Sequence, residues 1–199
     1  MFNEKNNAMK NFTVPQFFIA VLLIFTGFTL YSCNDDGPDI PPVRLEEMPG
    51  NYKGKLIIVQ GTTKTESIKD FKVKKDTISF AEFPINEIVK TVVKDPVKTE
   101  AAIKAIGKVK YNLTYTASVN KGNNAVELVF SPKTLEFQIP VDGVNKKTVV
   151  TLEAKEKGFY VGMDRSLRFA FTAQKITVDG TLLAPYEIIN YNFPFCIKN

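Results

Sequence analysis

Apolar and polar residues alternate with a period of two along most of residues 48–199. Successive side chains of a strand point to opposite faces of a sheet, so this alternation is typical of strands that bury one face. The runs are short and are separated by turn residues such as Asp142-Gly143 and Asp179-Gly180. We therefore expect one mainly β domain of roughly ten antiparallel strands. A sandwich and a barrel need the same alternation, so both architectures stay open.

The expected strands begin directly after the turn at Pro49-Gly50. They cover residues 52–59, 67–73, 77–80, 108–119, 125–130, 134–139, 147–154, 158–162, 167–173, 175–178 and 181–183. The residues that share one face of the long run 108–119 are Val109, Tyr111, Leu113, Tyr115 and Ala117. Beyond residue 184, Pro185, Pro194 and the run Asn190-Tyr191-Asn192 predict an irregular tail laid over the domain.

Residues 84–106 depart from this pattern. Their apolar residues recur at spacings of three and four, which is the period of a helix that buries one face. Asp95 followed by Pro96 is typical of an N-cap and the first position of a helix, and Gly107 is typical of a helix end. We expect two short helices that meet at Lys94-Asp95 and that plug or flank the sheet.

The first 32 residues are typical of a secretory signal rather than of a folded domain. Lys5 and Lys10 precede an apolar run over residues 17–30. At about 1.5 Å per helical residue this run is too short for a hydrocarbon core of ~30 Å. A basic stretch followed by a short apolar run indicates a signal peptide. Met9 is a second candidate start of translation, beside Met1.

The apolar run ends in Leu30-Tyr31-Ser32-Cys33. This sequence resembles the lipobox of bacterial lipoproteins, which has an aliphatic residue three positions and a small residue one position before a cysteine. Tyr31 is bulkier than is usual at its place. The resemblance implies that Cys33 carries a lipid with acyl chains such as palmitate, that the chain is cut between Ser32 and Cys33, and that the membrane is a partner through this anchor. An ordinary cleavable signal with an incidental cysteine is the alternative.

Residues 33–47 are expected to be a tether between the anchor and the domain. They hold five acidic residues, one arginine and three prolines, and such a segment cannot bury enough apolar surface to fold. Asn34, Asp35 and Asp36 directly follow the cysteine and resemble the acidic export signal of many Bacteroidetes lipoproteins. The resemblance implies an outer-membrane location with display on the cell surface. An anchor that faces the periplasm is the alternative.

Composition excludes several kinds of site in residues 48–199. The chain has no histidine and two cysteines, so we expect neither a Ser-His or Cys-His catalytic pair nor a histidine or thiolate metal site. The carboxylates stand at predicted turns or alternate along strands, and no pair stands out for acid-base catalysis. The 23 basic residues exceed the 15 acidic ones, but most are lysines that alternate with apolar residues, as on solvated strand faces. We therefore expect no enzyme activity, no metal, no cofactor and no nucleic-acid partner, and a buried, inert Cys196.

Tyr52, Tyr186 and Tyr191 are the candidate ligand contacts, because an exposed aromatic ring can stack on a sugar. The alternative for these rings is a phenylalanine-rich core, since the chain has 16 Phe and no Trp. Asp76-Thr77-Ile78 resembles the O-glycosylation site of exported Bacteroidetes proteins, which implies that Thr77 is modified. Gly50-Asn51-Tyr52 resembles the Gly-x-Trp start of calycins, which implies a barrel around a small apolar ligand; the expected helices interrupt the strand-only order of such a barrel.

The whole layout resembles the small lipoproteins of gut Bacteroides, with a lipobox at Cys33, an acidic tether and a β domain that opens with Gly50-x-Tyr52-x-Gly54. Within these, the chain resembles the domain-of-unknown-function family numbered 4840. The resemblance implies a location and no particular chemistry. We expect a lipid-anchored, non-catalytic binding or accessory module for a glycan, a lipid or an envelope protein. A structural lipoprotein without a small ligand and the calycin-like barrel are the alternatives.

Overall fold

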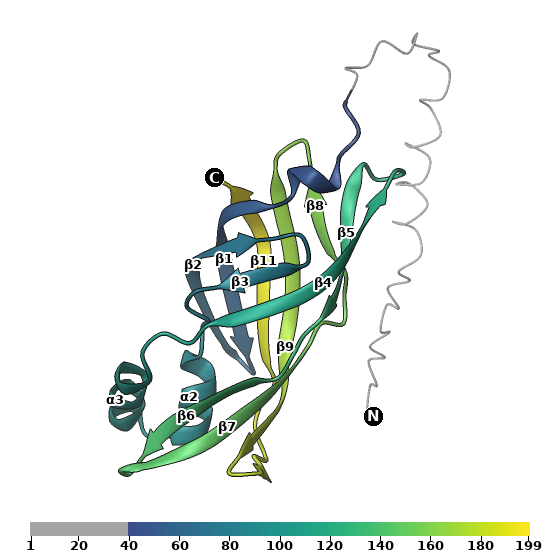
Figure 1. Ribbon diagram of the computed structural model, residues 1–199. Helices are drawn as coiled ribbons and strands as arrows, with labels where there is room; N and C mark the ends of the chain where they lie inside the picture. The colour runs from purple at the N-terminus through teal and green to yellow at the C-terminus, as the bar shows by residue number, and fades with distance from the viewer. Residues whose placement is uncertain (1–39) are drawn as a thin grey trace, which may run out of the picture. The chain divides into compact units, whose positions relative to one another are not determined.

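The computed structural model describes residues 40–199, which form one antiparallel sheet of eleven strands with two α-helices (Figure 1). The strands are β1 (Gly50–Gln60), β2 (Thr63–Val73), β3 (Thr77–Phe80), β4 (Tyr111–Asn120), β5 (Ala125–Ser131), β6 (Leu135–Val141), β7 (Val144–Glu153), β8 (Gly158–Val161), β9 (Ser166–Val178), β10 (Thr181–Leu182) and β11 (Ile189–Lys198). The helices are α2 (Asn86–Val93) and α3 (Pro96–Ile106), and a 3-10 turn, η1 (Leu45–Glu47), precedes β1. The mainly β class is therefore confirmed.

Eight of these strands close into a barrel. Their order is β11-β1-β2-β3-β4-β5-β8-β9, and β9 pairs back with β11. The barrel can close because β9 is long enough to have three strand neighbours. One edge of β9 pairs first with β8 and then with β7, and its other edge pairs with β11. The two expected strands 167–173 and 175–178 are thus one strand. The β6–β7 hairpin extends the sheet beyond the barrel (Figure 1). Of the two architectures that the sequence leaves open, the structure therefore has the barrel and not the sandwich.

The prediction of an irregular tail is wrong from Ile189 onward, because this segment is β11 and closes the barrel against β1 and β9. Pro194 is the residue that argues against a strand in the sequence, since proline has no N–H for a ladder hydrogen bond. In the structure the pairing with β9 shifts register between Phe193 and Cys196. Pro194 lies in this irregularity, where the ladder is interrupted and a missing N–H does no harm.

Aromatic rings fill the interior of the barrel. The rings of Phe169 and Phe193 stack with their centroids 4.5 Å apart, and Tyr52 stacks on Phe71 at 5.7 Å. Other buried interior rings are Phe80, Phe83, Phe171 and Tyr191. An interior filled by side chains is typical of small eight-stranded barrels. A calycin-like ligand at the barrel centre would have to displace these rings.

The opening Gly50-x-Tyr52-x-Gly54 has a physical role at the start of β1. The hydroxyl of Tyr52 donates a hydrogen bond to the backbone oxygen of Met48 (2.6 Å), which holds the chain as it enters the barrel. A Cβ on Gly54 would lie 2.1 Å from the sulfur of Cys196, so only glycine lets β1 and β11 approach here. Cys196 is fully buried, as expected, and burial raises the pKa of its thiol to about 12.

The two helices form where the spacing predicts them, at the lower end of the barrel in Figure 1. The side chain of Asp95 accepts a hydrogen bond from the N–H of Lys98 (2.9 Å) and caps α3, and Gly107 ends this helix with a φ of 67°. Ile88 and Val89 of α2 are fully buried, so this helix plugs the barrel end. In residues 40–199, no helix has the length and apolarity that crossing a membrane requires.

Candidate binding groove beside strand β4

The groove exists because β3 is much shorter than its neighbour β4. β3 pairs with residues 111–114 of β4, and a further hydrogen bond runs from the N–H of Tyr115 to the C=O of Asp76 (2.9 Å). Beyond this point β4 continues to Asn120 with β5 as its only strand neighbour in the described chain. The turn over residues 74–76 directly precedes β3 and keeps it from extending further along β4. This turn is closed by a hydrogen bond from the N–H of Lys74 to the C=O of Thr77 (2.8 Å).

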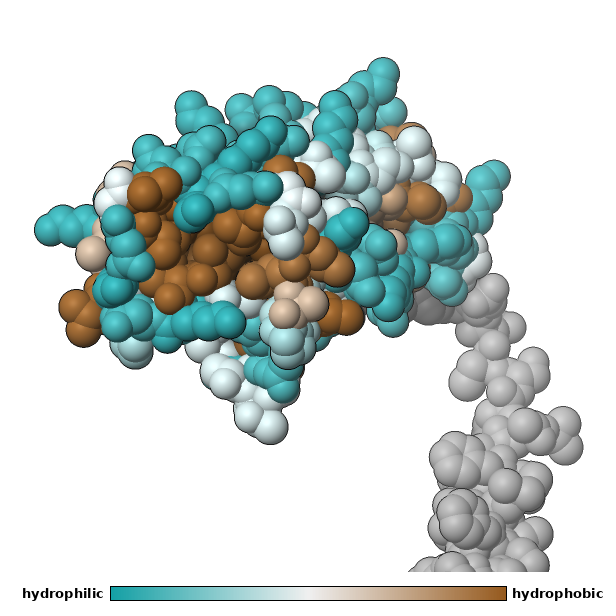
Figure 2. Space-filling model, turned by 90° about the horizontal axis from the view of Figure 1, so that it is seen from below, coloured by the Kyte–Doolittle hydropathy of each residue, from teal (hydrophilic) through white to brown (hydrophobic). Residues whose placement is uncertain are grey.

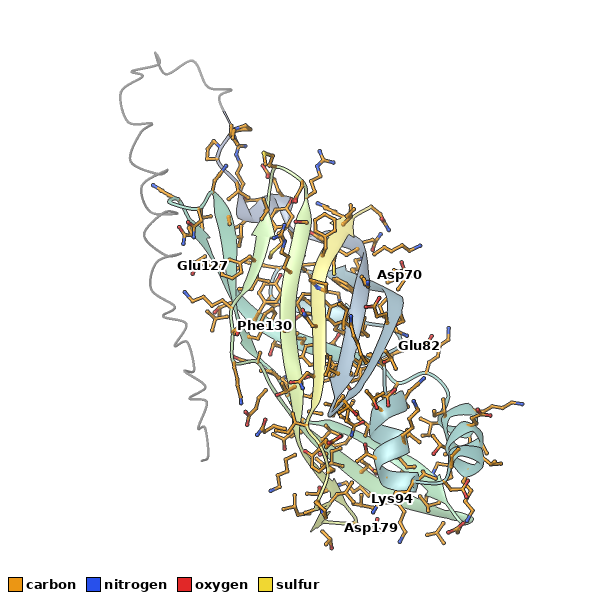
Figure 3. The ribbon with its side chains drawn as sticks, turned by 180° about the vertical axis from the view of Figure 1, so that it is seen from behind. Asp70, Glu82, Lys94, Glu127, Phe130 and Asp179 are labelled. Atoms are coloured by element: carbon orange, nitrogen blue, oxygen red, sulfur yellow. The ribbon has the colours of Figure 1, made fainter. Side chains whose placement is uncertain are left out.

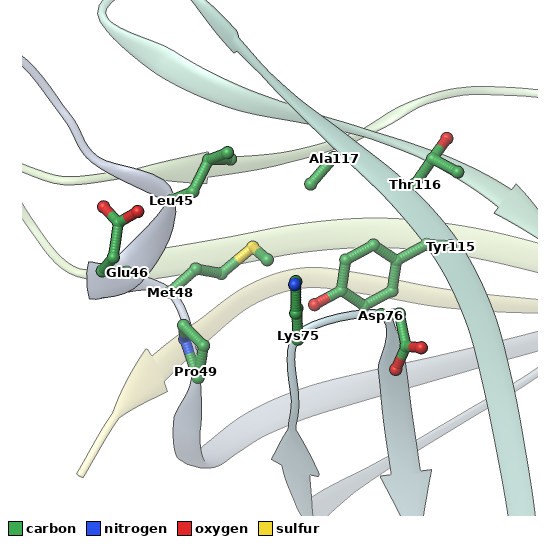
Figure 4. A pocket seen from close by; sticks show the side chains of 9 residues that line it. All are labelled: Leu45, Glu46, Met48, Pro49, Lys75, Asp76, Tyr115, Thr116 and Ala117. Carbon is green, nitrogen blue, oxygen red and sulfur yellow. The ribbon is translucent and has the colours of Figure 1, made fainter.

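A groove of about 810 Å³ lies between this part of β4 and the segment that leads into β1 (Figure 4). It is lined by Leu45, Glu46, Met48 and Pro49 from the η1 segment, by Lys75 and Asp76 from the β2–β3 turn, and by Tyr115, Thr116 and Ala117 from β4. In Figure 4 the side chain of Met48 and the ring of Tyr115 approach the gap from opposite sides, with Lys75 between them. The volume lies in the range of small-ligand sites, about 300–1,000 Å³.

The walls of the groove are apolar and fixed in place. Met48 and Tyr115 are only 1% and 4% exposed, so the surrounding core holds both side chains. The Tyr115 hydroxyl donates a hydrogen bond to the backbone oxygen of Lys74. Burial, and to a smaller extent the carboxylate of Asp76, raises the pKa of Tyr115, so the phenol is neutral at physiological pH. The apolar surface that a ligand can reach comes mainly from Leu45, Pro49 and Ala117, which are more exposed than these two side chains. Lys75 lies between the two walls, and Glu46 and Asp76 complete the lining.

The lower end of the molecule carries a second apolar area, which is hollowed and rimmed by hydrophilic residues in Figure 2. The half-buried apolar side chains of the helices, of β6 and of the β9–β10 region are Val92, Val93, Ile103, Ile106, Phe137, Val141, Val178 and Leu183. The pocket between α3 and β6 is smaller, about 380 Å³. β6 also has a free edge here, because in the described chain it pairs only with β7, but the pocket is less than half the volume of the upper groove, which is therefore the better-defined candidate.

The structure does not bring the three candidate tyrosines together. Tyr52 is 1% and Tyr191 is 0% exposed, so neither ring offers a face to a ligand in this structure. Tyr52 instead supports the groove from behind, through its hydrogen bond to Met48. Tyr186 is half-buried in the segment before β11, where its hydroxyl donates to the backbone oxygen of Ala173 (3.3 Å).

The other predicted site residues lie at the edge of the groove or outside the described residues. Thr77 is half-buried at the start of β3, and its hydroxyl donates to the carboxylate of Asp76 (2.8 Å), a residue of the groove lining. Its O-glycosylation stays a prediction. The cleavage and lipidation site Ser32-Cys33 and the export signal Asn34-Asp35-Asp36 lie outside residues 40–199, as do both candidate starts.

The last residues of the expected tether are attached to the barrel. The N–H of Val43 donates to the side-chain oxygen of Asn124 (2.8 Å), and the Asn124 amide donates to the backbone oxygen of Pro41 (3.2 Å). Val43 is 5% exposed and fits against Gly162, where a Cβ would meet it at 2.9 Å. The described chain therefore enters the fold beside the β4–β5 turn, at the groove end of the barrel.

The carboxylates are dispersed over the surface, as Figure 3 shows for Asp70, Glu82, Glu127 and Asp179. Each of these four forms an ion pair with a lysine, at 3.8, 3.7, 2.6 and 2.9 Å respectively. Lys157, followed by Asn120, lowers the pKa of Glu127 through hydrogen bonds to its carboxylate. In residues 40–199 no three Asp, Glu, Cys or His side chains come close enough to hold a metal ion.

The sequence analysis missed the groove residues Met48, Lys75 and Ala117. A usable signal was present, because the expected strand 77–80 is far shorter than the expected strand 108–119. Antiparallel neighbours of unequal length leave part of the longer one unpaired. If the expected strands 77–80 and 108–119 are assumed to pair, their lengths alone predict that one end of the longer strand is unpaired.

The protein is a small antiparallel β-barrel. Aromatic side chains fill its interior, and the unpaired end of β4 borders a groove at one end of the barrel. The chain belongs to the family "Domain of unknown function (DUF4840)", whose family model matches residues 47–178. This confirms the resemblance to the family numbered 4840. The matched residues include the turn and the strand that line the groove, but not β11. Comparisons with curated proteins and with solved structures gave no match.

Proposed function

We propose that this protein is a lipid-anchored lipoprotein of the cell envelope and a non-catalytic binding module, with the groove beside β4 as its ligand site. The observation that carries the proposal is an apolar groove of about 810 Å³ on a barrel whose interior is already filled. Rigid walls support it, because a site that needs no rearrangement costs less to occupy. The ligand is a glycan, a lipid or a partner protein of the envelope.

The lipid anchor is supported by the lipobox that ends at Cys33 and by the way the chain enters the barrel. Seven residue steps separate Cys33 from Ile40, and they span at most about 25 Å. Val43 is fixed beside the β4–β5 turn by Asn124. A lipid on Cys33 would therefore keep the groove end close to the membrane, which favours a ligand that is itself part of the envelope. Asn34-Asp35-Asp36 supports display on the cell surface, with the periplasmic face as the alternative.

The anchor is tested in cells by labelling with radioactive palmitate and by protease shaving of intact cells. We expect label in the wild type and none in Cys33→Ser, and loss of the barrel band on shaving while a periplasmic control protein survives. Equal labelling of the two chains would remove the anchor from the proposal. A band that is cleaved only after the outer membrane is permeabilised would move the protein to the periplasmic face.

The groove is tested by the thermal stability of the mature lipoprotein in nanodiscs, because a ligand that binds only the folded state raises Tm. Three probes represent the ligand classes: decanoate, a chitin trisaccharide and a nonapeptide of alternating valine and threonine. Ala117→Trp fills the groove from β4. Val97→Trp is the matched control, since Val97 is 80% exposed on α3, and α3 lies at the opposite end of the barrel from η1 (Figure 1).

We expect at least one probe to raise the Tm of the wild type and of Val97→Trp, but not that of Ala117→Trp. If no probe raises Tm in any of the three proteins, the groove is not a ligand site and the structural lipoprotein without a small ligand becomes the better description. If Tm rises equally in all three, the ligand binds elsewhere on the barrel.

A further inference from the structure

The free edge of β4 presents backbone groups, not only side chains, to the groove. In an antiparallel ladder the N–H and C=O of alternate residues point to the same side. The N–H of Tyr115 points to the β3 side, where it bonds to Asp76. The N–H and C=O of Ala117 and Val119 therefore point to the same side, where β4 has no strand neighbour in residues 40–199. The unpaired stretch, residues 116–120, is about 17 Å long.

This edge lacks the charges, prolines and bulges that protect strand edges in most proteins, although η1 lies across the groove from it. Natural edges are shielded by lysine, proline, bulges or a covering segment. The exposed or half-buried edge residues Thr116, Ala117, Ser118 and Val119 are all uncharged, and the β4–β5 pairing runs without a register shift. The neighbouring strands β1 and β2 show the opposite composition, with Lys53, Lys55, Lys64, Lys69 and Lys72. Within the described chain the edge of β2 that faces β3 is also unpaired, over residues 63–71, but it carries Lys64 and Lys69, whereas the unpaired end of β4 is uncharged.

The walls of the groove restrict what can pair with this edge. The η1 segment, with Leu45 and Met48, bounds the groove on the side opposite β4. The edge of a second barrel would bring its own neighbouring strands against η1, so a single extended chain is the simpler occupant. An acyl chain could fill the volume but has no hydrogen-bonding group for the backbone of Ala117 and Val119. The hydroxyls of a sugar can bond to these groups but do not repeat at the spacing of a strand.

We propose that the groove binds an extended peptide segment of another protein, which adds to β4 as a strand in the line that β3 would follow if it were longer. This inference rests on the proposed function of the groove. Peptides recognised in this way gain affinity from main-chain hydrogen bonds and specificity from alternate side chains. The small side chain of Ala117 leaves room on the groove side. The preferred peptide therefore carries a large apolar residue opposite Ala117 and polar residues at the alternate positions, which face solvent.

The test uses a phage library of nonapeptides with randomised positions, selected on the mature lipoprotein in nanodiscs and counter-selected on Ala117→Trp. The best peptide is then resynthesised with a single N-methyl group at each backbone position in turn. Methylation of the N–H groups that face β4 removes one hydrogen bond each and is expected to weaken binding about tenfold. Methylation of the alternate N–H groups, which face away, is the matched control and is expected to change Kd by less than about twofold.

Each outcome separates this inference from the proposed function. Alternating sensitivity to N-methylation supports strand addition. Uniform sensitivity, or none, overturns it. If the library gives no peptide that distinguishes the wild type from Ala117→Trp, while decanoate or the trisaccharide still binds the groove, the proposed function stands and the peptide inference falls. A concentration-dependent dimer that Ala117→Pro disrupts would also overturn it, because the edge would then belong to a second copy of the chain.

Discussion

The hydroxyls of Tyr52 and Tyr191 differ in one respect although both rings are buried in the same barrel. The Tyr52 hydroxyl donates to the backbone oxygen of Met48 (2.6 Å), whereas that of Tyr191 is buried without a hydrogen-bond partner among the described residues. A buried polar atom without a partner costs stability, and a buried hydrogen bond contributes to it. The same chemical change should therefore have opposite effects at the two positions.

We expect Tyr52→Phe to lower the free energy of unfolding by about 1 kcal/mol and Tyr191→Phe to raise it by about 1 kcal/mol. Both keep the aromatic ring, so cavity formation does not obscure the comparison. The measurement is urea unfolding of the mature lipoprotein, followed by circular dichroism. Two shifts of the same sign would contradict the account, since they would show that the Tyr191 hydroxyl has a partner or that the Met48 bond contributes nothing.

Helix α3 offers the clearest prediction at the level of an element. Asp95 accepts a hydrogen bond from the N–H of Lys98 at the first turn, and Pro96 occupies the first helical position. We expect Asp95→Ala to lower the free energy of unfolding by about 1 kcal/mol, because the first-turn N–H loses its cap. Glu100→Ala, an exposed change within the same helix, is the control and should change it by less than about 0.5 kcal/mol. Equal losses would mean that capping plays no part.

The elements that the sequence predicts well are those with local signals. The Asp95-Pro96 start and the Gly107 end bracket α3, and the period-two runs locate β1 to β8, although they divide β9 into two. β11 is missed because Pro194 argues against a strand, and the bulge that accommodates it is set by pairing with residues far away in sequence. Barrel closure and the groove depend on the same long-range pairing. Tyr52 and Tyr191 point into the barrel, which alternation does not settle, because it groups residues by face and a tyrosine suits either face.

At the scale of the whole molecule, six buried or half-buried tyrosines couple folding to alkaline pH. Desolvation is the largest cause of the raised pKa in all six: Tyr52, Tyr111, Tyr115, Tyr160, Tyr186 and Tyr191. The pKa of Tyr111 rises from its ordinary value of 10.0 to about 12. Burial also raises the pKa of Cys196, from 9.0 to about 12. The folded state therefore holds these protons more tightly than the unfolded chain does.

The sign of the pH dependence follows from this difference. Because the folded pKa values lie above the unfolded ones, the stability contribution is complete below pH 9, the ordinary pKa of the thiol, and is lost as the pH rises through 10 towards 12. We expect the barrel to unfold cooperatively in that range, so that the near-ultraviolet absorbance of tyrosinate appears together with loss of the β-sheet circular dichroism. The urea-unfolded protein is the control, and its tyrosines should titrate near pH 10, their ordinary value. If tyrosinate instead appears near pH 10 while the sheet signal persists, water reaches the tyrosine rings in the folded state. The barrel interior would then not be filled, and the outer groove would lose its main argument over an interior ligand site.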